Sequence, residues 1–175
     1  MVASGCTSIL PRSKESTSGP WQTYKDAQLT FDKVIPGQTT ENELQTLKLH
    51  PESNSNIAIL NYSDVVRRFL PNSSITMADL DAGVKDCISA KTGCKGYEVN
   101  QTILNKNRQG DVVADVLGFH RETDTVGWAF NGLILVKGGL VIYTLTGGQP
   151  SIVKHEENTS VLGPVQGLSQ KLFGF

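Results

Sequence analysis

Hydrophobic and polar positions divide the chain into a first half with helical periodicity and a second half with strand-like alternation. In the first half, apolar residues recur at intervals of three and four within short segments, and polar capping residues precede them. Thr40–Glu43 has the sequence of a capping box, and the polar loop Pro51–Asn56 follows. The pattern therefore predicts a short helix that begins at Thr40 and stops before Pro51.

Two further helices are expected before the strands begin. Ser63 can cap a helix that ends at Pro71, because its hydroxyl can accept a backbone N–H of the first turn. Thr76 and Asp79 form another capping pair, ahead of a helix through Ile88. Each helix has one narrow apolar stripe and is too short to be stable alone, so all of them need a sheet to pack on.

The second half supplies the sheet. Tyr97, Val99 and Ile103 alternate with polar residues, and Val112–Phe119 is apolar with a strand-like composition. The clearest element is a hairpin over Val126–Thr146.

A two-residue turn at Gly138 and Gly139 would fix the register of this hairpin. The bulkiest side chains then share one face, which is expected to lie against the helices. That face has Trp128, Phe130, Ile134, Val136, Val141 and Tyr143, and the other has Leu133, Leu135 and Ile142. The order of helices and then strands predicts an α+β fold, with short N-terminal helices on one face of an antiparallel sheet of three to five strands.

Composition narrows the function classes. The 16 Lys and Arg nearly balance the 17 Asp and Glu, and a net charge of −1 argues against a nucleic-acid partner, which would require a basic face. No apolar run approaches the roughly 20 residues of a membrane-spanning helix. The 38% of hydrophobic residues is modest but sufficient for a core.

The N-terminus has features of a lipoprotein sorting signal. Ala3–Cys6 resembles a bacterial lipobox, in which small residues precede a cysteine that is lipidated after cleavage of a signal peptide, and we interpret Met1 as a start placed after a truncated leader. Thr7, which is not Asp, is typical of sorting to the outer membrane in such lipoproteins. Thr7–Pro20 is rich in Ser and Thr and is expected to be a flexible tether. The expected division is thus a tether over residues 1–20 and a single domain over 21–175; the alternative for Cys6 is an incidental thiol in a disordered tail.

Cys87 and Cys94 enclose a short segment in which Gly93 allows the chain to turn back, so a structural disulfide is expected. A metal site would need more ligands than the three histidines offer, and a redox pair would favour a Cys-x-x-Cys motif. A disulfide also agrees with the oxidising periplasm that a lipobox implies.

The sequence has few candidate catalytic or metal-binding residues. None of His50, His120 and His155 belongs to a recognisable catalytic or metal-binding motif, His50 is expected on the surface, and Gly147–Pro150 has the composition of a turn. Asp111, Asp115, Glu122 and Asp124 could hold a cation, but their spacing matches no calcium loop and is typical of solvated charges at a sheet edge. The sequence therefore predicts no catalytic, cofactor or metal site and no enzyme.

Several features together resemble the BamE family, also called SmpA/OmlA, of small outer-membrane lipoproteins. They are the lipobox-like Ala3–Cys6, the pattern Phe31-x-x-Val34-Ile35-x-Gly37-x-Thr39-Thr40-x-x-Glu43-Leu44, and the hairpin around Trp128 to Tyr143. The chain departs from the family at Leu47–Pro51 and in the insertion from Asn61 to Cys94, as a larger relative or a member of the fold shared by β-lactamase-inhibitor proteins would. The resemblance implies two helices on a three-stranded sheet and a non-enzymatic accessory role in envelope assembly.

The expected function is thus that of a lipoprotein anchored through Cys6 in the outer membrane, whose periplasmic domain binds other envelope proteins as a scaffold. The candidate partner surface is Leu133, Leu135 and Ile142, unless the segment around Trp21 and Tyr24 covers that face. A secreted or periplasmic inhibitor or ligand-binding module is the alternative function, and an enzyme that uses His120 is a weaker third.

Overall fold

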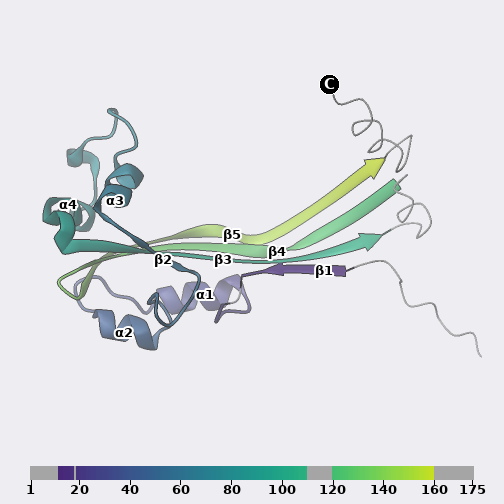
Figure 1. The fold of residues 1–175 in the computed structure, drawn as a ribbon, viewed down its shortest axis with the longest axis horizontal. Helices are drawn as coiled ribbons and strands as arrows, with labels where there is room; N and C mark the ends of the chain where they lie inside the picture. The colour runs from purple at the N-terminus through teal and green to yellow at the C-terminus, as the bar shows by residue number, and fades with distance from the viewer. Residues whose placement is uncertain (1–11, 18, 110–119, 160–175) are drawn as a thin grey trace, which may run out of the picture. The chain divides into compact units, whose positions relative to one another are not determined.

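The structure analysed is a computed structural model, which describes residues 12–17, 19–109 and 120–159. The chain is an α+β protein with a mostly antiparallel, open five-stranded sheet (Figure 1). The elements of the described residues are β1 (Arg12–Ser16), α1 (Tyr24–Phe31), α2 (Glu41–Thr46), β2 (Ile57–Leu60), α3 (Tyr62–Phe69), the 3-10 turn η1 (Met77–Asp79), α4 (Ala82–Ala90), the 3-10 turn η2 (Lys91–Gly93), β3 (Cys94–Gln109), β4 (His120–Lys137) and β5 (Leu140–Thr159).

Internal contacts divide the chain into two units. The larger unit comprises residues 16–102 and 128–150 and includes every helix of the described residues, whereas the smaller unit takes the remaining segments. β3, β4 and β5 each contribute residues to both units.

Part of the expected tether is a strand. Arg12–Ser16 form β1, which is the neighbour of β3 in the sheet, and the Thr17 N–H that follows donates to the Thr102 carbonyl at 3.1 Å. A segment rich in Ser and Thr can join a sheet because backbone groups alone make the ladder. The prediction of a flexible tether is therefore wrong for residues 12–16.

The strand order is β1-β3-β4-β5, and β2 pairs with β3 separately. β2 is antiparallel to β3, with Ile57 opposite Val99 and Ile59 opposite Tyr97. Its four residues directly precede α3, and neither length nor alternation marked them as a strand in the sequence.

The hairpin between β4 and β5 confirms the predicted turn. Gly138 and Gly139 have φ of 59° and 78°, the left-handed conformation that a two-residue turn of the primed type requires. The two strands run beyond the predicted Val126–Thr146 in both directions. Gly147–Pro150 was expected to be a turn but lies inside β5.

Helices cover both faces of the sheet in the larger unit, not one face as predicted (Figure 1). On the α1 side, Phe130 of β4 is fully buried, and its ring centroid lies 6.1, 5.4 and 5.1 Å from those of Trp21, Tyr24 and Phe31. Gly132 permits this approach, because a Cβ atom there would lie 2.2 Å from the Phe31 ring. α1 therefore packs on the face of β4 that has the bulkiest side chains.

α3 and α4 pack on the opposite face. Leu133 and Leu135 are 1% and 0% exposed and form one apolar cluster with Val65 of α3 and Val84 of α4, against which Ile142 also packs. The predicted partner surface of Leu133, Leu135 and Ile142 is therefore part of the core. The segment that covers it is the 61–90 region, whereas Trp21 and Tyr24 lie on the other face.

Side-chain alternation is interrupted early in β5. Ile142 and Tyr143 are consecutive, yet both pack against the α3–α4 cluster, and the Tyr143 ring lies 5.8 Å from that of Phe69. The sequence placed Tyr143 on the opposite face. Counting alternate residues from the turn therefore gives the wrong face for Tyr143.

The disulfide between Cys87 and Cys94 is present, as the sequence predicts. It joins the last turns of α4 to the first residue of β3, with 5.2 Å between the Cα atoms, and both cysteines lie in the α3–α4 cluster. It thereby fixes α4 to the sheet at the point where β3 begins.

The helix caps agree in part with the sequence. The Thr40–Glu43 capping box is confirmed at the start of α2. α3 is capped by Asn61 and not by Ser63, because the Asn61 carboxamide oxygen accepts the N–H of both Ser63 and Asp64. The Thr76–Asp79 pair encloses η1, and α4 begins three residues after Asp79, at Ala82.

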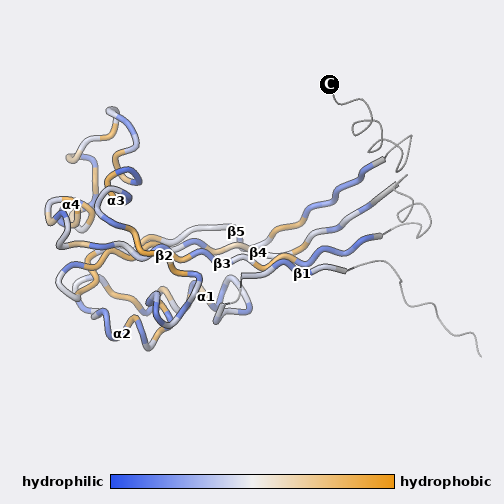
Figure 2. The backbone as a smooth tube through the Cα atoms, in the orientation of Figure 1, coloured by the Kyte–Doolittle hydropathy of each residue, from blue (hydrophilic) through white to orange (hydrophobic). Residues whose placement is uncertain are grey.

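The described part of the smaller unit consists of polar strand segments, which Figure 2 colours largely blue. Glu15 of β1 and Lys106 of β3 form an ion pair at 2.8 Å, and His155 Nδ1 of β5 lies 2.6 Å from Asp124 Oδ1 of β4. His155 therefore lies in a strand.

Candidate functional site

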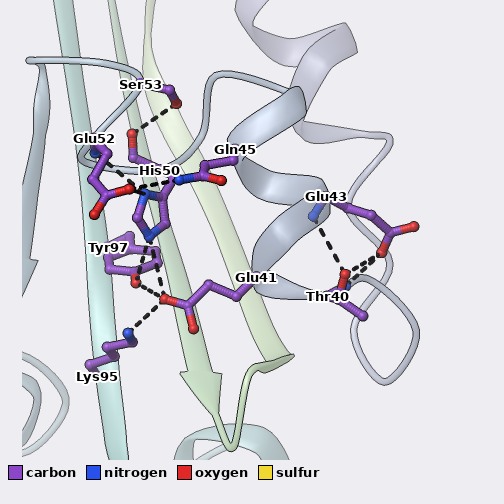
Figure 3. A network of polar contacts seen from close by, with 9 residues as sticks. All are labelled: Thr40, Glu41, Glu43, Gln45, His50, Glu52, Ser53, Lys95 and Tyr97. Atoms are coloured by element: carbon purple, nitrogen blue, oxygen red, sulfur yellow. Dashed lines mark hydrogen bonds and ion pairs between the residues drawn. The ribbon is translucent and has the colours of Figure 1, made fainter.

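A network of titratable side chains joins α2, the loop after it and β3 in the larger unit (Figure 3). Its centre is Glu41 Oε1, which lies 2.6 Å from Lys95 Nζ and 3.4 Å from His50 Nε2 and accepts the Tyr97 hydroxyl. The Tyr97 hydroxyl also lies 3.3 Å from His50 Nε2. Tyr97 is 1% exposed, so this set of groups reaches into the core.

Local structure explains how these four side chains meet. Glu41 is the first residue of α2, directly after the capping residue Thr40. Lys95 and Tyr97 are two residues apart on β3 and therefore project from the same face. The His50 ring is held by its own loop, because Nδ1 accepts the N–H of Glu52 at 3.3 Å. Nε2 then faces Glu41 Oε1 and the Tyr97 hydroxyl.

The electrostatics of the network favour the ionic form of Glu41. Partial burial alone would raise the pKa of Glu41, but the hydrogen bonds from Lys95 and Tyr97 outweigh it and hold the pKa below its usual value. The hydrogen bond to Glu41 raises the pKa of Lys95. Burial, followed by the Glu41 carboxylate, raises the pKa of Tyr97.

These shifts are opposite to what acid–base catalysis needs. A general base works best with a pKa near the working pH, whereas the pKa of Glu41 is moved further below it and that of Tyr97 further above. The Glu41 carboxylate is already shared by three donors of the protein. The arrangement is suited to holding α2 against β3.

The network makes stability depend on pH. Because the folded pKa of Glu41 is lowered, its contribution is present above the unfolded pKa and is lost as pH falls through the folded pKa. We expect Glu41→Gln to lower the free energy of unfolding at pH 7 and to flatten its decline between about pH 5 and pH 3. Urea titrations across this range would measure both effects.

Glu52→Gln is the matched control, because Glu52 is exposed and its printed partners, Gln45 and His50, exclude Lys95 and Tyr97. It should retain the acid-side decline of the wild type. An unchanged pH profile in Glu41→Gln would contradict the stabilising role of the network.

A pocket lies on the α3 side of the β4–β5 hairpin. Its volume is about 220 Å³. Leu133 and Leu145 supply apolar surface, and Arg68 of α3 supplies a cation. Leu145 is 47% exposed, although Leu133 is buried. The other lining residues are Asn131, Gly132, Thr146 and Gly147.

Arg68 has hydrogen-bonding capacity to spare. Its side chain is 41% exposed, and one nitrogen, Nη1, donates to Glu98 of β3. A guanidinium has five N–H donors, and among the described residues this contact with Glu98 is the one that Arg68 makes through its side chain. The remaining donors can therefore bind an anionic group beside the apolar floor of the pocket.

The same pocket adjoins the outer edge of β5. Near the hairpin this edge is occupied, because the Gly37 N–H donates to Val141 and the Val141 N–H to Thr39, at 2.8 and 2.9 Å. Between Thr144 and Gly147 no backbone hydrogen bond to a further segment occurs within the described residues. Pro150, which lacks an N–H, limits the open stretch on its other side.

Several predicted residues lie outside the described part of the chain. Cys6, Asp111 and Asp115 are among residues that the structure does not describe, and so is the predicted strand Val112–Phe119. His120 begins β4, but its side chain is not described. No group of three or more potential metal ligands occurs among the described residues.

Sequence reasoning missed both sites. Glu41, His50 and Tyr97 are separated by up to 56 residues, and their only signals in the sequence were a capping box, a residue before Pro51 and an alternating strand. The pocket depends on Arg68 of α3 and Leu145 of β5 lying close together on one side of the sheet, which no local pattern can reveal.

The comparisons with known proteins return no relative. No family model, no curated protein and no solved structure matches this chain. The resemblance to the BamE family thus stays a hypothesis. Within the described residues, no helix is long and apolar enough to cross a membrane.

Proposed function

We propose that this protein is an outer-membrane lipoprotein, tethered through Cys6 on the periplasmic side, whose α+β domain acts as a non-enzymatic scaffold for other envelope proteins. Tethering raises the local concentration of the binding domain near its partners, so that weak individual contacts suffice. The BamE-like pattern around Gly37 to Leu44 supports the choice of this class.

The observation that carries the proposal is the exposed pocket beside an open stretch of sheet edge. Helices cover both faces of the sheet around the hairpin, but no segment of the described residues covers the edge at Thr144–Gly147 of β5 or the pocket next to it. Edges of this kind bind extended segments by strand addition.

Two further observations support an extracytoplasmic scaffold. The buried Cys87–Cys94 disulfide is typical of proteins in oxidising compartments such as the periplasm. The titratable network around Glu41 has pKa shifts suited to structural ion pairing.

Lipidation of Cys6 is the direct test. Expressed behind a lipoprotein signal peptide in a Gram-negative host, the chain should fractionate with the outer membrane, and mass spectrometry should find a diacylglyceryl group on Cys6. Cys6→Ser should release the protein into the periplasm, because the acyl chains provide the membrane affinity.

An unmodified Cys6 in a soluble wild-type product would overturn the tethered scaffold. That result would favour the secreted inhibitor or ligand-binding module instead. Site-specific crosslinking from Thr146 in intact cells would then identify what the exposed edge contacts.

A further inference from the structure

The volume of the pocket beside β5 defines what it can hold. Pockets for drug-sized ligands and cofactors measure roughly 300–1,000 Å³. The 220 Å³ available here is below that range and fits one side chain of a partner. Buried anchors of this size provide much of the energy at protein interfaces.

The lining specifies the chemistry of the occupant. Leu145, which is 47% exposed, favours an apolar side chain in the pocket, and the buried Leu133 lies beneath it. Arg68 has donors that no described residue uses, and these favour a carboxylate close to that apolar side chain. Asn131 adds a polar group at the margin, whereas the Thr146 hydroxyl accepts a hydrogen bond from Gln28 of α1.

The edge of β5 specifies the backbone conformation of the occupant. A segment that pairs with Thr144–Gly147 must be extended, and in an extended segment side chains two residues apart share one face. An apolar residue in the pocket therefore places the residue two positions away on the same side as Arg68.

We propose that this pocket binds an extended segment of a partner protein, with one large apolar side chain on the exposed Leu145 and an acidic side chain two residues away on Arg68. The inference rests on the proposed scaffold function and names the partner chemistry of that surface. Backbone pairing along β5 is independent of sequence, so these two side chains supply the specificity.

Purified full-length protein and a blocked peptide test the proposal. The probe is acetyl-Thr-Thr-Phe-Thr-Asp-Thr-amide, titrated by calorimetry. Two control peptides replace the Phe by Ala or the Asp by Lys. We expect saturable binding of the probe, about tenfold weaker binding of each control peptide, and the same loss for Arg68→Gln with the probe.

Gly147→Leu blocks the pocket from the protein side. A Cβ atom at Gly147 would meet nothing within 4 Å and φ there is not positive, so the variant should fold and fill the space. It should abolish binding of the probe. Ile59→Thr is the control, because Ile59 is 62% exposed on the other edge strand, β2, and should leave binding unchanged. Circular dichroism and Tm establish that each variant is folded.

Three results would overturn the proposal: no binding of the probe up to about 1 mM, equal binding of the Lys-containing peptide, or full binding by folded Gly147→Leu. Loss of binding in Ile59→Thr alone would place the site on β2. Any of these results with Cys6 lipidated would remove this binding surface and leave the membrane tether, so the two proposals fail separately.

Discussion

Phe130→Ala is expected to lower the free energy of unfolding by about 3–5 kcal/mol, the range for truncation of a fully buried phenylalanine. Phe130 is 0% exposed and contacts three aromatic rings on the α1 side of the sheet. Its loss removes the common partner of Trp21, Tyr24 and Phe31. Urea unfolding followed by tryptophan fluorescence would measure the change, since Trp21 belongs to the cluster.

Leu29→Ala is the matched control, in the helix that packs on Phe130. Leu29 lies in α1 but is 52% exposed, so its truncation should change stability by less than about 0.5 kcal/mol. The loss of stability in Phe130→Leu should lie between the losses in Phe130→Ala and Leu29→Ala. A loss below about 1 kcal/mol in Phe130→Ala would mean that the aromatic cluster does not hold α1 on the sheet.

Removal of the disulfide is the second large effect. In the double variant Cys87→Ala, Cys94→Ala, the free energy of unfolding should fall by about 2–3 kcal/mol. The bond joins residues seven positions apart and so restricts the unfolded chain. The midpoint of urea unfolding under non-oxidising conditions would report the loss.

The wild type itself provides the control for this experiment. Wild-type protein that is unfolded, reduced and refolded with excess reductant should match the double variant, because both lack the same constraint. If the double variant kept the wild-type midpoint, the bond would contribute nothing to stability and α4 would be held by packing alone.

The sequence predicted those elements whose signals are local. The Thr40–Glu43 capping box, the Gly138-Gly139 turn and the Cys87–Cys94 pair each depend on residues within a few positions of one another, and each is present in the structure. A cap, a turn and a short loop are settled by backbone geometry that tertiary packing need not alter.

Features that depend on distant partners could not be predicted. Leu133 and Leu135 have the pattern of an exposed sheet face until α3 and α4 are placed over them, and nothing in β4 reveals that layer. β1 is a strand because β3 accepts it, although its composition is typical of a tether. For the same reason, the network around Glu41 and the pocket at Arg68 emerge only when segments far apart in the chain are brought together.

The backbone hydrogen bonds between residues 37–41 and the hairpin tip have a consequence for the order of folding. Gly37, Thr39 and Glu41 bond to Gly139 and Val141, a separation of more than half the chain. α1 and α2 are eight and six residues long and cannot persist alone in water. As the chain is synthesised from its N-terminus, both helices must wait until β4 and β5 exist, so folding is expected to be slow and to depend on a complete chain.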